Sequence, residues 1–388
     1  MDDDNKIRIE KIKLADLYDF ACRTIGNPSF RKAAPIPLIR ALSQSRNPYG
    51  RPDDLALLVA YCADQCVGYK GLLPGLMKTD SQTSRVYWGM AWYVLPEFRR
   101  LGIGKRLLEE IKNTKIDYIT PQMTKSAESV FRRAGYRDLG RLTYFQLRVD
   151  RLNLWSKFLS KKTPYPKLTG SCLVRLNRLL YSITKRIFYG VAWRSSQRRQ
   201  KFSVRWKVVD QIDESKWGVY NRQVKGPAFF RGIEAVNWML KHPWVVSRNK
   251  QEVDVANFYF SIIREMFMFA AVEINSSDSG RPKGFLVLSI SKKKERIRVK
   301  ILDFYFHHPE DREIAAHLAL RYAKVYLADR IDFPASLEDY FKNTTACKKL
   351  IKKQSQLYMF YPASNRSPLA VYKGKVELNY CDGDIAFT

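Results

Sequence analysis

The chain has 388 residues, of which 68 are Lys or Arg and 38 are Asp or Glu, giving a formal net charge of +30. This length suits two domains of roughly 150–200 residues, and the 46% hydrophobic content excludes a disordered or collagen-like chain. Residues 151–209 hold 15 Lys and Arg and no acidic residue, so half of the net charge lies in this segment. Such a concentration indicates an anionic neighbour, namely a membrane surface, nucleic acid or a phosphorylated substrate.

The N-terminal residues are acidic and lack the apolar stretch of a secretory signal. No uncharged apolar run reaches the roughly 18 residues of a membrane-spanning helix. The six cysteines lack the paired spacing of a zinc site, which is typical of reduced cysteines in a cytoplasmic protein. We therefore expect a cytoplasmic chain, peripheral at the membrane if its basic segment meets lipid.

The first half predicts strands followed by alternating helices and strands. Short runs rich in aliphatic, β-branched and aromatic residues predict strands at 55–61, 66–73 and 85–95. The spacing of Ile103, Leu107, Leu108 and Ile111 then predicts a helix over 102–113. A short strand at 116–119, a helix at 126–134 and a strand at 142–149 complete this half.

The second half repeats this order at an offset of 213–216 residues, with Gly68 matching Gly284 and Pro96 matching Pro309. Its strands are expected at 266–274, 283–291, 296–306, 331–333 and 357–361, and its helices at 313–328 and 337–352. The repeat indicates an α/β fold (α+β, mixed sheet) built from two copies of one unit. We predict domains at 1–150 and 210–388, joined by a basic linker at 151–209.

The linker contains a basic amphipathic helix, predicted over 172–193. At helical spacing, one face carries the apolar residues Leu173, Leu176, Leu180, Ile183, Ile187 and Val191. The basic residues Arg175, Arg178, Lys185 and Arg186 lie on or beside the other face. The pattern favours a helix that packs its apolar face on the domains and leaves its basic face in solvent. A helix lying on an anionic membrane surface is the alternative. Nucleic acid is disfavoured, because the segment contains no recognised fold for reading bases.

The strongest local signal is Arg99-x-x-Gly102-x-Gly104, which follows a strand and opens a helix. Glycines at a helix start allow close approach of a ligand, and the free N–H groups of the first turn favour a phosphate. Arg99, Arg100, Lys105 and Arg106 add positive charge. These residues predict a site for a diphosphate.

This motif resembles the acyl-coenzyme A motif of the GNAT superfamily of N-acyltransferases, and the order of elements over about residues 55–147 is similar to that family. The resemblance implies two mixed sheets flanked by helices. It also implies that the backbone of Tyr93, Val94 and Leu95 pairs with the pantetheine arm of acetyl-CoA. The pyrophosphate would be held by the N–H groups of Leu101, Gly102, Ile103, Gly104 and Lys105, with Arg99 and Arg100 beside it. The acyl carbonyl would lie where the strand ending at Leu95 diverges from the strand at 116–119.

The sequence departs from the family pattern at two positions of the coenzyme site. Phe131 stands where many relatives have a Tyr that acts as general acid, and Ser126 stands where many have Asn. The strand 85–95 contains no carboxylate that could act as a base. Tyr93 or Tyr136 remains as a candidate donor to the thiolate, although packing is the commoner role of such aromatic residues.

The second copy carries Arg312-Glu-Ile-Ala-Ala-His317 opposite the glycine motif, with acidic residues at the helix start. These carboxylates would compete with an anion, so we predict that this copy is degenerate and does not bind coenzyme A. No spacing of His and carboxylate residues predicts a metal site.

Two classes of function stay open. The first is an N-acetyltransferase that moves an acyl group from acetyl-CoA to an amine, with a phosphorylated or lipid-linked acceptor suggested by charge; Fem-type aminoacyl transfer is its variant. The second is a non-catalytic module that senses coenzyme A or docks on a membrane. The complete glycine motif favours coenzyme A over aminoacyl-tRNA.

Overall fold

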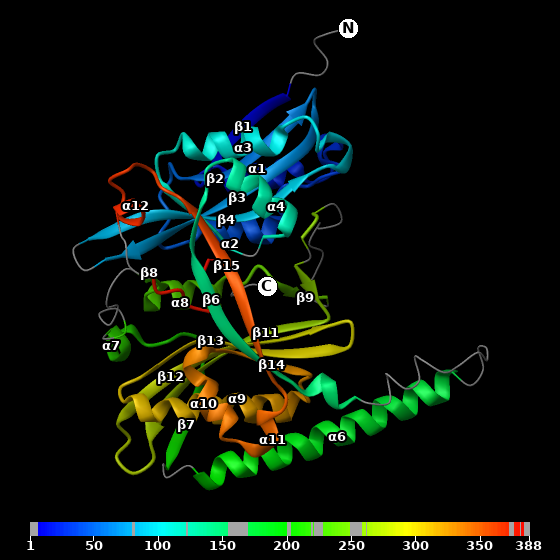
Figure 1. Cartoon of the computed structure of the whole chain (residues 1–388), viewed down its shortest axis with the longest axis vertical. Coiled ribbons are helices and arrows are strands. Elements are labelled where there is room, and N and C mark those ends of the chain that lie inside the picture. Colours follow the sequence, from blue (N-terminus) through cyan, green and yellow to red (C-terminus); the bar gives the residue numbers. More distant parts are fainter. Residues whose placement is uncertain are drawn as a thin grey trace. The chain divides into compact units, whose positions relative to one another are not determined.

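The structure is a computed structural model that describes residues 7–79, 82–121, 123–153, 170–199, 203–218, 220, 228–248, 258–260, 262–371, 376–380 and 382–383 (Figure 1). Contacts divide the chain into two units. Unit 1 comprises Met1–Leu142, Asp213–Ile263 and Gln356–Thr388, and unit 2 comprises Thr143–Ile212 and Arg264–Ser355. Each unit joins segments that are distant in the sequence, unlike the predicted division into 1–150, 151–209 and 210–388.

The helices and strands are short, with one exception near the middle of the chain. Their bounds, in chain order, are β1 Ile7–Lys13, α1 Leu17–Thr24, α2 Leu38–Ser45, β2 Leu55–Cys62, β3 Gln65–Lys78, β4 Thr83–Val94, η2 Pro96–Phe98, α3 Ile103–Lys112, β5 Asp117–Pro121, α4 Lys125–Arg133, β6 Arg137–Arg148, α6 Gly170–Arg199, β7 Val204–Val209, α7 Glu214–Trp217, β8 Ala228–Phe230, α8 Ile233–Lys241, β11 Met266–Ser276, β12 Pro282–Lys293, β13 Arg296–Phe306, η5 Pro309–Arg312, α9 Glu313–Tyr326, β14 Arg330–Pro334, α10 Glu338–Lys342, α11 Thr345–Lys348, β15 Ile351–Tyr361 and α12 Pro368–Val371.

Unit 1 is a mixed sheet whose strands follow the order β1-β2-β3-β4-β5-β15. The pairs from β1 to β4 are antiparallel, β4 and β5 are parallel, and β5 and β15 are antiparallel. The run Leu-Ala-Leu-Leu-Val-Ala of β2 carries no polar side chain and is buried along its length, as expected of a strand covered on both faces. Helix α3 buries Ile103, Leu107, Leu108 and Ile111 against the sheet, as their spacing predicts.

Unit 2 repeats the arrangement with β7-β11-β12-β13-β14-β6. Its core contains apolar residues of β11, β12 and β13 on one side and of α9 on the other. Gly68 of the first copy lies opposite Val94, and its counterpart Gly284 lies opposite Phe306. An added Cβ at either glycine would meet the backbone of the neighbouring strand. The sequence repeat therefore corresponds to a structural repeat.

Each copy gives its last strand to the other unit. Residues 144–148 of β6 pair with β14 of unit 2, and residues 358–361 of β15 pair with β5 of unit 1. Long-range pairing of this kind leaves little local trace in a sequence, so the strands at 142–149 and 357–361 could be predicted but their partners could not. The exchange explains why the compact units differ from the predicted domain bounds.

The segment before the second copy's repeated strands also belongs to unit 1. Strand β8 pairs with the end of β3, and the Trp238 indole of α8 donates to the Ser43 carbonyl at 2.8 Å. The Gly232 N–H donates to the Tyr49 hydroxyl at 2.7 Å, and desolvation raises the pKa of that tyrosine. These contacts attach α8 to α2 and to the loop that follows it.

Helix α6 extends beyond the predicted 172–193 at both ends and buries a different face. Its buried residues include Lys185, Tyr189 and Ala192, whereas Ile183 and Ile187 of the predicted packing face are exposed. The Lys185 ammonium donates to Asp329 at 3.1 Å, and the Tyr189 hydroxyl donates to the Ala328 carbonyl at 2.9 Å. A buried carboxylate in unit 2 therefore selects which face of α6 is covered, and the expectation of a packed apolar face was wrong.

The other predicted elements are present, apart from the helix expected over 337–352, although β6 begins at Arg137 rather than 142 and β15 at Ile351 rather than 357. No element was predicted from the sequence at the positions of β1, α1, α2, β7, α7, β8, α8 and α12. The stretch 337–352 contains the short helices α10 and α11, and β15 already begins at Ile351. Asn343 ends the first helix and Thr344 caps the second, which breaks the helical pattern. Residues 154–169 of the predicted basic linker at 151–209 lie outside the described residues.

Among the described residues, Cys22 and Cys66 are free thiols. Within the same part of the chain, no helix is both long and apolar enough to cross a bilayer.

A buried histidine of unit 2 makes the stability of the protein depend on pH. His317 accepts or donates a hydrogen bond with the Ser196 hydroxyl at 3.0 Å, and burial, followed by the charge of Arg321, lowers its pKa from 6.5 to about 4. An unfolded chain binds a proton at this residue below pH 6.5, whereas the folded chain does so only near pH 4. Stability is therefore lost as the pH falls through this window, by up to about 3 kcal/mol.

We expect His317→Gln, which can retain a hydrogen bond to Ser196, to flatten the fall in stability between pH 6.5 and pH 4. Urea unfolding at several pH values measures the difference from the wild type. His308→Gln, at an exposed position, is the control and should leave the pH dependence unchanged. Equal slopes for the wild type and His317→Gln would contradict the assignment.

Candidate functional site

Strand β4 has one edge that is paired along its length and one that is not. Its antiparallel register with β3 continues to Val94, which lies opposite Gly68. Its parallel register with β5 ends at Trp88, which lies opposite Ile119. From Gly89 to Val94, β4 therefore has no pairing with the described residues of β5, and this is the strand for which the family resemblance implied a divergence.

The open stretch of β4 contains a bulge at Ala91. The register with β3 shifts here, and Ala91 has a φ of 45°, in the left-handed region. A residue with a Cβ in this conformation costs about 1 kcal/mol, and such strain clusters at functional sites. The bulge marks the point at which β4 turns its backbone away from regular pairing.

The backbone beyond the bulge points in two alternating directions. The Leu95 N–H donates to the Val67 carbonyl at 2.9 Å, so Leu95 and Tyr93 direct their backbone groups toward β3. The Val94 carbonyl points the other way and accepts from the Arg99 guanidinium at 3.2 Å. Of the three residues expected to pair with pantetheine, Val94 is the one whose backbone faces the open edge.

The loop after β4 brings a helix N-terminus next to this edge. Gly102 is the N-cap of α3 and has a φ of 72°, and an added Cβ there would meet nothing within 4 Å. The first backbone hydrogen bond of the helix is that from Arg106 N–H to Gly102 carbonyl at 3.1 Å. The N–H groups of Ile103, Gly104 and Lys105 therefore point out of the helix end, which is where an anion binds. The Leu101 N–H already donates to the Phe98 carbonyl at 3.2 Å.

Basic side chains surround this helix end. Arg99, Arg100 and Lys105 are exposed, and Leu101 is 53% exposed between them. Arg106 points elsewhere, since its guanidinium donates to the Ile7 carbonyl of β1 at 2.8 Å. The expected positive charge at the site is therefore carried by Arg99, Arg100 and Lys105 and by the helix dipole. We call the helix end with these three cations the phosphate cradle.

The glycine-capped helix with outward N–H groups is the arrangement that the glycine motif predicted, whereas the bulge in β4 was not predicted. A sequence model of the family described as Acetyltransferase (GNAT) domain matches residues 53–138, from just before β2 to the start of β6. Residues 53–138 form a GNAT domain. No curated protein matches the sequence significantly.

Three solved structures to which the chain is similar are as follows. An N-myristoyltransferase from Saccharomyces cerevisiae with bound myristoyl-CoA has a TM-score of 0.50 at 7% identity, covering 92% of this chain and 78% of that one. A GCN5-related N-acetyltransferase from Anabaena variabilis has a TM-score of 0.49 at 12% identity, with 92% and 73% covered. A tandem GNAT protein from the clavulanic acid biosynthesis pathway has a TM-score of 0.44 at 12% identity, with 92% and 99% covered. At 7% identity the likeness to the N-myristoyltransferase concerns the fold alone.

One side of the GNAT domain's open strand is covered by α3 and α4. An added Cβ at Gly104 of α3 would lie 2.9 Å from the Trp92 ring, so only glycine allows the helix this close to β4. The Trp92 ring lies 5.0 Å from Phe131 of α4, and Phe131 is buried. Phe131 places a ring without a hydroxyl at the position where many family members have the acidic Tyr. Its role in holding coenzyme A stays a prediction.

Lys70 of β3 is the functional candidate that sequence reasoning missed. It is 2% exposed, and its ammonium lies 5.9 Å from the Trp92 ring, 5.8 Å from Tyr118 and 6.0 Å from Phe131. The Tyr118 hydroxyl occupies the space that a Cβ of Gly89 would need, so this group of rings lies directly against the diverging part of β4. In the sequence, the sign of this site was Lys70 as the one charged residue in the predicted strand at 66–73. Because burying a charged side chain costs free energy, a buried lysine indicates a specific role.

The two remaining candidates on this side lie on α4 and just after it. Ser126 is in the first turn of α4, 3.0 Å from the hydroxyl of the capping Thr124. Tyr136 is buried, and its ring lies 4.8 Å from Phe131. Burial raises the pKa of Tyr136 far above its usual value, so its hydroxyl stays protonated and can donate but not act as a base.

The other side of the open strand carries Tyr93, whose side chain is partly exposed. Its ring stacks on Tyr259 at 4.4 Å and lies 5.7 Å from Tyr69, which in turn stacks on Phe258 at 6.1 Å. Tyr259 is 63% exposed. Thus Tyr93 is placed in an aromatic group formed partly by a segment far along the chain.

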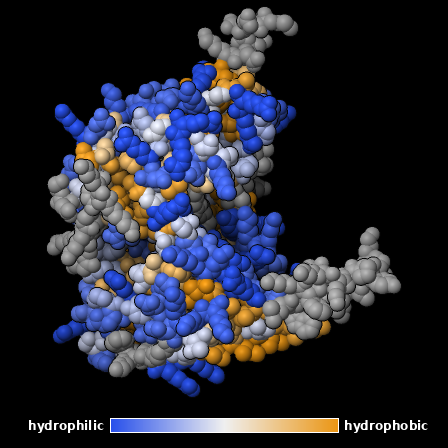
Figure 2. All heavy atoms as spheres, in the orientation of Figure 1, coloured by the Kyte–Doolittle hydropathy of each residue, from blue (hydrophilic) through white to orange (hydrophobic). Residues whose placement is uncertain are grey.

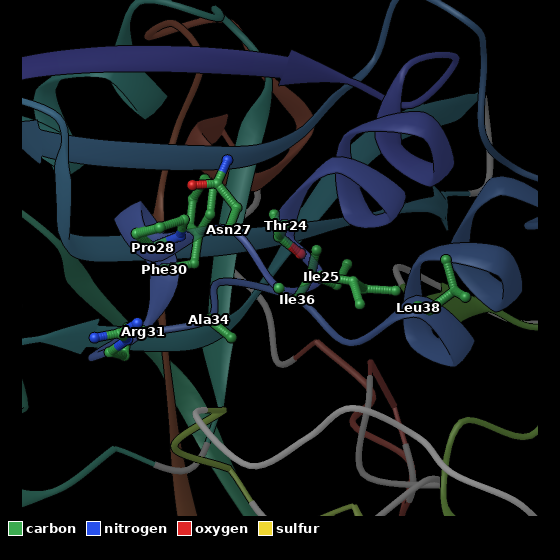
Figure 3. A pocket seen from close by; sticks show the side chains of 10 residues that line it. Thr24, Ile25, Asn27, Pro28, Phe30, Arg31, Ala34, Ile36 and Leu38 are labelled. Atoms are coloured by element: carbon green, nitrogen blue, oxygen red, sulfur yellow. The ribbon is translucent and has the colours of Figure 1, made fainter.

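A pocket in the N-terminal part of the chain lies apart from the residues that the sequence analysis assigned to the coenzyme site. It has a volume of about 150 Å³ and is lined by α1 and the segment leading to α2, including Asn27, Arg31 and Leu38 (Figure 3). The neighbouring Lys32 lies 3.7 Å from Glu97 of η2, which places this segment beside the approach to the phosphate cradle. In the part of the chain that the structure describes, no group of three His, Cys, Asp or Glu residues could hold a metal ion.

The second GNAT-like unit keeps the strand geometry without the cradle. The register between β12 and β13 shifts at Leu302, and β13 pairs with β14 only up to Lys300 opposite Asp332. Where the first copy has glycines, α9 begins with Glu313, and the preceding Asp311 is buried with its carboxylate 2.9 Å from Lys283. An anion at this helix end would meet acidic groups.

The close approach of α3 to β4 gives a stability prediction. We expect Gly104→Ala to lower the free energy of unfolding by about 1–3 kcal/mol, because the new methyl group would press on the Trp92 ring. Gly190→Ala in α6 is the matched control, since nothing lies within 4 Å of its Cβ, and it should leave stability equal or higher. Thermal unfolding with tryptophan fluorescence measures both, and equal midpoints would contradict the packing described.

Proposed function

We propose that the chain is an N-acetyltransferase that uses acetyl-CoA as donor and a primary amine as acceptor. Acyl transfer is supported in general by the GNAT domain at 53–138. The observation that carries the proposal is the phosphate cradle at the end of an open strand, because a nucleotide-linked thioester needs both an anion site and an extended channel. The donor's diphosphate would bind the N–H groups of Ile103, Gly104 and Lys105, with Arg99 and Arg100 as counter-ions.

The open edge of β4 would bind the pantetheine arm. Its amides can pair with Val94 as another strand would, which orients the thioester toward the Ala91 bulge. The Arg99 guanidinium, which holds the Val94 carbonyl in the free protein, would move to the diphosphate. We infer an acetyl rather than a long acyl group, because Trp92, Tyr118 and Phe131 fill the space next to the bulge.

The chemistry requires a nucleophile and two proton transfers. The neutral amine of the acceptor attacks the thioester carbon, the carbon–sulfur bond breaks, the sulfur gains a proton, and the amine nitrogen loses one to water. The buried Lys70 ammonium would stabilise the negative charge that develops on oxygen and sulfur. The Tyr136 hydroxyl, protonated at neutral pH, is the candidate donor to the sulfur, with Tyr93 as the alternative on the other side of β4.

The acceptor would approach the side of β4 that carries Tyr93 and Tyr259, since that side remains partly exposed. Given the excess of basic residues, we infer an acceptor amine that bears phosphate or a lipid anchor. The degenerate second unit would bind no coenzyme A, because Glu313 begins α9 where the cradle would be. A screen of amino-sugar nucleotides with acetyl-CoA that gives no thiol release above background would count against this acceptor class.

The second candidate function is a coenzyme A sensor without turnover. The observation that favours it is Phe131, which removes the usual acidic hydroxyl from the site. Fem-type aminoacyl transfer receives less support, because the cradle suits a nucleotide diphosphate. Calorimetry and thiol release separate the candidates: a sensor binds acetyl-CoA and releases no thiol with any amine.

The cradle predicts a loss of donor binding in Gly102→Glu. A carboxylate at the helix end would repel the diphosphate, so we expect acetyl-CoA binding measured by calorimetry to fall by about 100-fold or more. Gly280→Glu is a matched control, because Gly280 has a similar φ of 66° and equally open surroundings in unit 2. Equal affinity in the two variants would exclude the cradle, and no heat with the wild type would exclude both candidate functions.

The buried lysine predicts a separation of binding from turnover. We expect Lys70→Met to lower kcat for acetyl transfer by about 10–1000-fold while the affinity for acetyl-CoA changes little, because the ammonium acts on charge that develops during the reaction. Lys78→Met, at the partly exposed end of the same strand, is the control. Circular dichroism confirms folding. An unchanged kcat in Lys70→Met would remove Lys70 from the mechanism.

A further inference from the structure

Helix α6 is attached to unit 2 by one face. Its side chains Lys185, Phe188, Tyr189, Ala192 and Ser196 are buried against α9 and the residues that follow it. The Tyr181 hydroxyl donates to Asp329 at 2.7 Å, beside the contact from Lys185. Asp329 also accepts from the Ile297 N–H at 2.6 Å, so the anchor is part of the β13 backbone network.

The opposite face of α6 is apolar and exposed. At about 100° per residue, its members lie on the far side of the helix from the anchored residues. They are Leu176 at 48%, Leu179 at 58%, Leu180 at 36%, Ile183 at 44%, Ile187 at 63% and Val191 at 54% exposure, and we call this set the apolar stripe. Figure 2 shows it as an orange band along α6. From Leu176 to Val191 the stripe is about 22 Å long.

Scattered exposed apolar residues are common, but a contiguous stripe opposite an anchored face is not. An amphipathic helix of a globular protein normally buries its apolar face. Here the buried face contains a lysine and a serine, and six large aliphatic side chains remain in water. The position of α6 is therefore set by Phe188, Tyr189 and Ala192 in the core of unit 2 together with the polar contacts to Asp329, and its apolar stripe is left for an outside partner.

The charges beside the stripe limit which partner fits. Arg175 and Arg186 lie along one edge, and Arg194 and Arg198 continue beyond its C-terminal end; all four are exposed. The segment 151–209 contains no Asp or Glu. A second copy of the chain laid on the stripe would bring arginines against arginines, whereas an anionic lipid surface offers acyl chains for the leucines and phosphates for the arginines.

We propose that α6 docks the protein on anionic lipid bilayers, with the apolar stripe inserted at the level of the headgroups and the arginines on lipid phosphates. The helix lies in the plane of the surface. The buried salt bridge between Lys185 and Asp329 keeps the stripe facing outward. Docking does not require coenzyme A, and it stands whether or not the chain transfers acyl groups.

Flotation of the full chain with vesicles tests this proposal. We expect binding to vesicles that contain phosphatidylglycerol and little binding to vesicles of phosphatidylcholine alone, with the difference falling as salt is added. Ile183→Glu/Ile187→Glu should lower binding by about tenfold or more, because two charges would replace inserted side chains. Val208→Glu/Val371→Glu, at positions 59% and 57% exposed outside α6, is the matched control and should bind like the wild type.

The arginines are tested separately. Arg175→Gln/Arg186→Gln should weaken binding to phosphatidylglycerol vesicles, and Lys348→Gln/Lys349→Gln, an exposed pair elsewhere in unit 2, should not. Circular dichroism and thermal unfolding establish that all variants are folded. Equal recovery with both vesicle types, or wild-type binding by Ile183→Glu/Ile187→Glu, would overturn the proposal. A dimer in light scattering that this variant abolishes, without vesicle binding, would assign the stripe to a second copy instead.

Discussion

The divergence of β4 from β5 is the feature on which the candidate site depends, and β5 is held in place from both sides. It has five residues, pairs with β4 at three positions, and pairs with β15 at 358–361. A strand this short would not keep its direction from one neighbour alone. Because β15 comes from the second copy, the open edge of β4 in the first copy depends on residues more than 200 positions away.

This dependence gives a physical reason for a second copy that lacks the cradle. Unit 1 also requires β8 and α8, whose contacts with β3 and α2 cover part of its sheet, and the stacked Tyr259 reaches Tyr93 from the same segment. The second copy could therefore lose its glycines without loss of the first site, provided that its exchanged strand and this segment persist. The first copy must keep the residues of the candidate site, whereas the second copy must keep the elements that complete the fold of unit 1.

The sequence was most informative where structure is determined locally. Strands β2 to β4, helix α3 and the glycine-capped turn follow from periodicity and from the conformational demands of Gly102, all of which act within a few residues. The strand exchange could not be predicted, since a strand's pattern reports that it pairs but not with which partner. Lys70 was missed for a related reason: its surroundings come from β4, β5 and α4, and their rings surround it only after folding.

In helix α6, the face predicted to be buried from the apolar periodicity differs from the face that is buried in the structure. Its apolar periodicity indicated the helix correctly and its buried face wrongly, because burying several leucines competes with satisfying one carboxylate in unit 2. Leaving Asp329 buried without a cation would cost several kcal/mol, and Lys185, Tyr181 and the Ile297 N–H together remove that penalty. Each apolar side chain left in water forgoes about 1.5–3 kcal/mol of burial, and a lipid surface would recover that loss. The two proposals assign the cations of the phosphate cradle to a diphosphate and the exposed arginines of α6 to lipid phosphates. One fold holds both because each set of cations is positioned by backbone and buried polar contacts of its own unit.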